Sequence, residues 1–81
     1  MDDLTEPGRL LSAVAVHDGA MLSRITAKLA VHPIASFSYL LTAADRAEVR
    51  IEVRGGDWHE ERVLQKVRRL VGVVEAEYVA G

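Results

Sequence analysis

The spacing of apolar residues along this chain changes twice from strand-like alternation to a helical repeat and back, and this order leaves few possible folds. Residues 9–16 alternate between two rather apolar faces, which is typical of a strand in the centre of a sheet. After His17-Asp18-Gly19, apolar residues recur at helical spacing until His32-Pro33, where the proline ends the helix. Asp18 is the expected N-cap of this helix.

A pair of strands is predicted next. Residues 34–42 and 47–54 are joined by a turn, and the second segment alternates strictly between apolar and charged side chains. Its apolar side consists of Val49, Ile51 and Val53, and the charged side chains point the other way. Gly55-Gly56 then ends the strand.

The second half of the pattern repeats the first. Asp57 and Glu60 are expected to form an N-cap and capping box for a helix whose apolar face extends to Val71, and Gly72 stops it. Residues 73–79 form the last strand, with Val74 expected on the same face as Ala76 and Tyr78 and opposite Val73.

The predicted element order is therefore βαββαβ. Right-handed crossovers between the first and second strands, and between the third and fourth, permit essentially one compact arrangement. This is an α+β, ferredoxin-like sandwich: a four-stranded antiparallel sheet in the order 4-1-3-2, with two helices on one face.

Size and charge exclude several classes of protein. The chain has 81 residues and 8.9 kDa, enough for one small domain, which we place at residues 9–81 after a flexible acidic tail at residues 1–8. The net charge of −2 gives no electrostatic case for nucleic acid or an acidic membrane. There is no cysteine, no apolar stretch long enough to span a bilayer and no secretory signal, because Asp2 and Asp3 are wrong for one, so a cytoplasmic protein is expected.

Catalytic and metal sites are not expected. The topology puts His17 at the opposite edge of the domain from His32 and His59, which excludes a site of three histidines. A cluster of His32, His59 and Asp57 is geometrically possible, but histidines at helix ends are more often solvated. No serine or threonine is placed beside both a histidine and a carboxylate, so neither catalytic residues nor a cofactor are predicted.

The junction of the first strand and the first helix is the most suggestive feature of the sequence. Backbone N–H groups at a helix N-terminus next to a glycine form a site for an anion such as the carboxylate of a small metabolite. The carboxylate of Asp18 offers the simpler alternative, because it could cap the same donors. Gly19 is expected to adopt positive φ in this turn.

The stretch from His17 to Thr26, followed by Leu29 and Ile34 in a βαββαβ order, resembles the ACT domain, a regulatory module that commonly binds amino acids and pairs side by side. Within that family the chain is similar to the small regulatory subunit of acetolactate (acetohydroxyacid) synthase. Leu22-Ser23-Arg24-Ile25 matches that subunit's L-S-R-I segment, and residues 63–74 are similar to its late helix and final strand.

The resemblance implies a non-catalytic regulatory subunit in branched-chain amino acid biosynthesis. It would dock onto a large thiamine-diphosphate-dependent catalytic subunit and regulate it allosterically, with a possible amino-acid effector. Aligned on Leu22, the family's asparagines fall on His17 and Ala35, its proline on Gly19 and its glycine on Ala20. The expected effector-binding residues are His17, Asp18, Gly19, Ala20, Met21, Leu22 and Ala35. The alternative is a stand-alone homodimeric amino-acid sensor or dimerisation module.

Residues 34–42 form an apolar edge strand, which could pair with the same strand of a second copy to give an eight-stranded sheet. We therefore expect a homodimer whose interface includes Phe37, Tyr39 and Leu41. Leu40 and Leu41 lie on opposite faces, so one of them should be in the core and the other at the interface.

Overall fold

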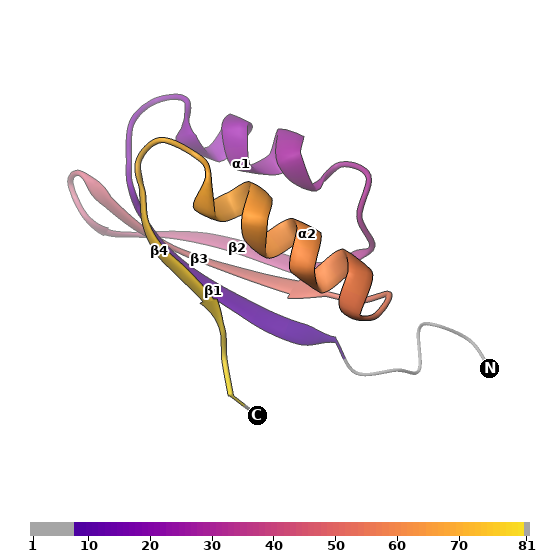
Figure 1. The fold of residues 1–81 in the computed structure, drawn as a ribbon. Helices are drawn as coiled ribbons and strands as arrows, with labels where there is room; N and C mark the ends of the chain where they lie inside the picture. The colour runs from indigo at the N-terminus through magenta and orange to yellow at the C-terminus, as the bar shows by residue number, and fades with distance from the viewer. Residues whose placement is uncertain (1–7, 81) are drawn as a thin grey trace.

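The fold was obtained as a computed structural model, which describes residues 8–80. Its elements are β1 (Arg9–Val16), α1 (Met21–Leu29), β2 (Ile34–Ala43), β3 (Arg46–Val53), α2 (Asp57–Arg68) and β4 (Val73–Tyr78). The strands form one antiparallel sheet in the order β2-β3-β1-β4, and both helices cover the same face (Figure 1). The predicted ferredoxin-like α+β fold is confirmed. Of the expected acidic tail, residues 1–7 lie outside the described residues.

Strand β3 shows why the sheet has a dry face and a wet face. Val49, Ile51 and Val53 are fully buried toward the helices, whereas Glu48 and Arg50 lie on the open face and form an ion pair of 2.9 Å. Burying one row of a strand while solvating the other is the usual arrangement when helices cover one side of an antiparallel sheet. The rest of the core comes from β1, both helices and β4: Leu11, Ala13, Ala15, Met21, Ile25, Leu29, Val63, Val67 and Ala76.

The helix starts differ from the prediction. Helix α1 begins after Ala20, so Asp18 lies two residues before the N-cap, and α2 begins at Asp57 after the N-cap Gly56. Neither N-cap makes a side-chain hydrogen bond, and the capping box predicted for α2 is absent, because the side chain of Glu60 instead accepts from Arg9 at 3.1 Å. At α1 the side chain of Asp18 still accepts locally from the N–H of Ala20, whereas at α2 Glu60 makes a tertiary contact in place of the local one.

Strand β4 contains an irregularity that the alternation in sequence did not reveal. Val14 pairs with Glu75, but Ala15 pairs with Val73, so Val74 is an extra residue in a β-bulge. Val73 consequently packs against the core and Val74 is exposed, the reverse of the prediction. Val71 also differs from expectation: α2 ends at Arg68, and Val71 is 85% exposed in the following turn.

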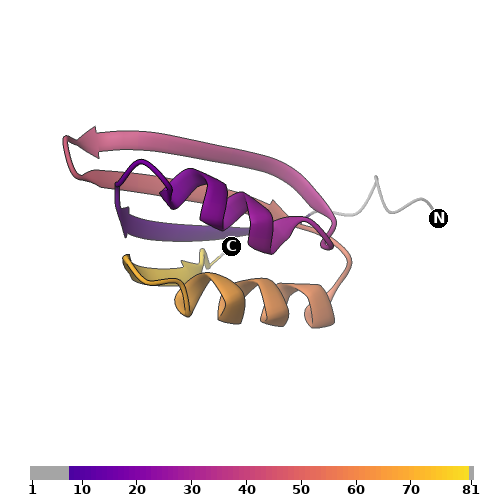
Figure 2. The ribbon, with the colours of Figure 1, turned by 90° about the horizontal axis from the view of Figure 1, so that it is seen from above.

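The two edges of the sheet are unequal. Strand β2 has ten residues, and Figure 2 shows it as the outermost strand, with both helices lying over the other strands. Strand β4 has six residues, contains the bulge, and carries two exposed glutamates, Glu75 and Glu77. Strand β2 has irregularities of its own at Ala35 and Thr42, but the stretch between them, residues 36–41, is regular and uncharged. Short and charged edges resist pairing with another chain, so β2 is the edge more open to a further strand.

Gly72 and Gly19 are predicted to respond differently to alanine. Gly72 has φ of 99°, and a Cβ there would lie 2.7 Å from Cε of Met21, so we expect Gly72→Ala to lower the free energy of unfolding by about 1–2 kcal/mol. Gly19, contrary to expectation, does not have positive φ and has open space around it, so Gly19→Ala should change this free energy by less than about 0.5 kcal/mol. Urea denaturation measures the free energy of unfolding of both variants. Equal losses in the two variants would contradict the different roles given to Gly72 and Gly19.

Candidate functional site

The loop after β1 is held between two other segments of the chain. The N–H of Val16 donates to the carbonyl of Gly72 at 2.7 Å, and the N–H of His17 donates to the carbonyl of Asp45 at 2.8 Å. The predicted meeting of this loop with the β2–β3 turn and with the end of the second helical segment is therefore present. The loop is fixed from both sides at the start of α1.

Asp18 already supplies an anion to the start of α1. Its Oδ1 accepts from the N–H of Ala20 at 2.9 Å, its carbonyl accepts from the N–H of Met21 at 3.3 Å, and its Oδ2 accepts from Arg24 at 2.8 Å. The hydrogen bond from the Ala20 amide, helped by the guanidinium of Arg24, lowers the pKa of Asp18 below its usual range. An effector carboxylate at this helix end would compete with the carboxylate of Asp18.

His17 joins the loop to the edge strand. Its Nδ1 lies 2.6 Å from the hydroxyl of Tyr39 on β2, and the two ring centroids are 5.6 Å apart. Burial, with the nearby charge of Asp18 as a smaller cause, raises the pKa of Tyr39 above its usual value. A residue predicted to bind an effector and a residue predicted at the interface thus lie together.

The other residues predicted to bind an effector do not lie together at one site. Gly19 and Ala20 are exposed, and Leu22 is 44% exposed, so all three border the solvent at the loop. Met21 is fully buried in the core and is not available to a ligand. Ala35 lies at the start of β2, beside the end of β3, whereas the loop lies beside the start of β3.

The distance between Ala35 and the loop follows from the register. Val16 pairs with Arg46, and Ile34 pairs with Val53, so the two sites are separated by seven steps along β3. At about 3.3 Å per residue this is roughly 23 Å. A single copy of the chain therefore does not bring Ala35 to the loop.

The predicted interface residues form one row on β2. Phe37, Tyr39 and Leu41 pair with residues of β3 that face the helices, yet the first two are only half-buried and Leu41 is 52% exposed. Leu40, on the opposite face, is 63% exposed. The prediction that one of the two leucines lies in the core is wrong, because the helical layer does not reach over this end of β2 (Figure 2), although Phe37 and Tyr39 still pack against the core.

The cluster of His32, His59 and Asp57 that the topology made possible is only partly present, because His32 contacts His59 and not Asp57. His32 is buried, its Nδ1 lies 3.0 Å from Nδ1 of His59, and the ammonium of Lys66 donates to its Nε2 at 2.9 Å. Lys66 has only protons to give, so the single N–H of neutral His32 is at Nδ1 and points to His59. Across residues 8–80, no three histidine, aspartate or glutamate side chains are placed to hold a metal ion.

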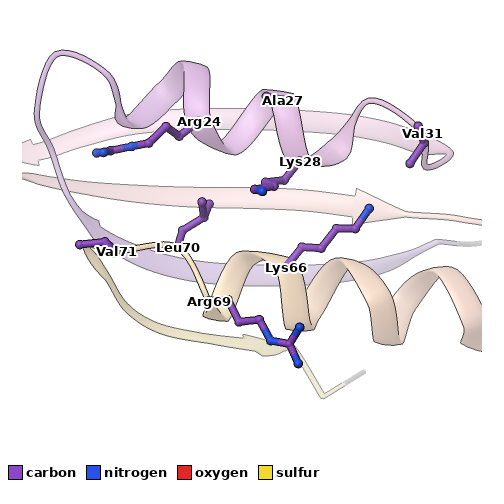
Figure 3. A pocket seen from close by; sticks show the side chains of 8 residues that line it. All are labelled: Arg24, Ala27, Lys28, Val31, Lys66, Arg69, Leu70 and Val71. Atoms are coloured by element: carbon purple, nitrogen blue, oxygen red, sulfur yellow. The ribbon is translucent and has the colours of Figure 1, made fainter.

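The structure also contains a groove between the two helices that the sequence analysis did not predict (Figure 3). This groove of about 740 Å³ separates the outer sides of α1 and α2 and is mostly apolar with a basic rim. Its lining consists of Arg24, Ala27, Lys28, Val31, Lys66, Arg69, Leu70 and Val71. The sequence shows that Arg24 and Lys28 lie on one side of α1, because they are four residues apart. It does not show that Lys66 of α2 faces the same groove.

No protein-family model matches this chain, and no curated protein matches it significantly. Within the described part of the chain, no helix is long and apolar enough to cross a bilayer.

The His32 contacts predict a pH-dependent stability. Burial, followed by the charge of Lys66, lowers the pKa of His32 below the usual 6.5, so on acidification the unfolded chain takes up this proton first. The free energy of unfolding should therefore be highest above pH 6.5 and decline as the pH falls through and below it. His32→Asn should flatten this decline in urea denaturation between pH 5 and 8. If the free energy of unfolding of the variant declined with the same slope, titratable groups other than His32 would cause the pH dependence.

Proposed function

We propose that this chain is a non-catalytic regulatory module that forms a homodimer through β2 and acts on a larger enzyme. The observation that carries the proposal is the long edge strand β2, which the helices cover only in part and which has a half-exposed apolar row. An edge of this length and apolar character is the kind that adds a neighbouring strand. A small domain with a thin core also gains stability from oligomerisation.

A two-fold pairing of β2 would also complete the divided effector site. In an antiparallel pair, the start of one strand lies beside the end of the other. Ala35 of the partner subunit would then approach the loop at residues 17–20, where His17 already contacts Tyr39 of the edge strand. We propose that an amino-acid effector binds at this junction, with its carboxylate displacing Asp18 from the start of α1.

The nature of the regulated enzyme rests on the resemblance to the acetolactate synthase small subunit at Leu22-Ser23-Arg24-Ile25 and at residues 63–74. Its partner would be a thiamine-diphosphate-dependent acetolactate-synthase-like catalytic subunit. The second candidate function is a stand-alone amino-acid sensor. The contact between His17 and Tyr39 favours it, because this contact would couple effector binding directly to the dimer edge without a further protein.

The dimer is tested by charge at the edge strand. Sedimentation equilibrium should give the wild type a mass of twice the 8.9 kDa chain. The Leu41→Glu variant should have the mass of a monomer and remain folded, because Leu41 is 52% exposed. Val74→Glu is the matched control, since Val74 is 58% exposed on the opposite edge strand and its variant should remain dimeric. Dissociation of the Val74 variant alone would transfer the interface to β4 and overturn the proposal.

The enzyme partner is tested by isolation and reconstitution. The tagged chain should retain a thiamine-diphosphate enzyme near one-to-one from lysate of its source organism, identified by mass spectrometry. Adding the purified chain to that enzyme should change its rate of acetolactate formation. Recovery of the chain alone, together with calorimetric binding of valine, leucine or isoleucine, would support the stand-alone sensor instead.

A further inference from the structure

The groove between α1 and α2 gathers positive charge on an acidic protein. Four of the chain's ten basic residues line it, and no acidic residue of the described part does, although the sequence contains twelve. Arg24 pairs with Asp18 at one end of the groove, and Lys66 is held by its hydrogen bond to His32. Lys28 and Arg69 make no ion pair with any residue in 8–80. An occupant that carries negative charge would relieve the repulsion between these cations.

Apolar surface lies between and beside the cations. Val31 is 77% exposed and Val71 is 85% exposed, and Figure 3 shows them at opposite ends of the groove, with Leu70 directed toward α1. Large apolar side chains that gather in a groove with polar edges mark interaction sites more often than single exposed residues do. The groove therefore suits a ligand that has both carboxylates and apolar side chains.

We propose that this groove binds an acidic, amphipathic peptide segment of a partner protein. Carboxylates of the segment would pair with Lys28, Lys66 and Arg69, and its apolar side chains would lie on Leu70 and Val71. A segment that lies along a groove between helices with an apolar stripe is a recurring mode of peptide recognition. The inference stands on the groove alone and does not depend on the proposed function.

The charge distribution elsewhere favours a peptide over a larger anionic surface. On the open face of the sheet Arg50 pairs with Glu48 and Arg54 pairs with Glu52, and β4 carries Glu75 and Glu77, so the basic side chains of this face are matched by acidic ones, unlike those of the groove. A nucleic acid or an anionic bilayer requires a more extended basic face. A peptide needs only the length of the groove, which runs along α1 from Arg24 to Val31 just after the helix, and from Lys66 near the end of α2 to Val71 in the following turn.

The test uses fluorescence anisotropy with a synthetic peptide of about twelve residues, with leucines at helical spacing and glutamates elsewhere. Lys28→Glu should weaken its binding by about tenfold, because a favourable charge pair becomes repulsive. Val71→Ser should weaken binding by about threefold through lost apolar contact, without a change of charge. Arg46→Glu, which reverses an exposed cation outside the groove, should change it by less than about twofold.

Two further probes separate the groove from general attraction. A peptide with serine in place of every leucine should bind at least about fivefold more weakly, since the apolar floor then contributes nothing. Phosphatidylserine vesicles and a single-stranded oligonucleotide should bind more weakly than the leucine peptide. Equal binding of the serine peptide, tighter binding of vesicles or oligonucleotide, or equal losses in the Lys28 and Arg46 variants would each overturn the proposal. Circular dichroism of each variant controls for folding.

Discussion

Burial of the sheet's apolar face beneath the two helices is the constraint on which the rest of the structure depends. Ala13 pairs with Ala76, and Ala15 pairs with Ala47, so the floor under the helices has little side-chain bulk across β1, β3 and β4. Met21 is fully buried beside this floor, where its flexible side chain fills the space next to Gly72. Because the helices lie mainly over these strands, β2 is covered only in part, through Phe37 and Tyr39.

The sequence predicted those parts of the fold that depend on period and on chain connectivity. The strict alternation of Val49, Ile51 and Val53 gave the orientation of β3, and the crossover rule then left one strand order. The prediction failed where a tertiary contact overrode a local rule. Glu60 contacts Arg9 instead of closing a capping box, and the register of β1 inserts a bulge at Val74. Contacts between residues so far apart in the sequence cannot be predicted from the local spacing of apolar and polar residues.

The candidate site was likewise predictable from the sequence only in part. The residues of the loop after β1 could be found from sequence, since a glycine beside a helix start and an acidic side chain are both visible there. The contact of His17 with Tyr39 could not, because it joins residues twenty-two positions apart through the position of the edge strand. The groove between the helices depends on how far each helix is rotated about its axis, which is set by burial of Ile25 and Val67 rather than by the basic residues themselves.

The unequal edges of the sheet also determine how far any association through it can extend. Polymerisation of β-proteins requires two receptive edges, so that each added chain offers a site for the next. Here the bulge at Val74 and the carboxylates of Glu75 and Glu77 disfavour pairing at β4, so β2, which is regular over residues 36–41, is the more receptive edge. In the proposed dimer the two receptive edges would be used against each other, so growth by strand addition would end at two chains and would not continue into a fibre.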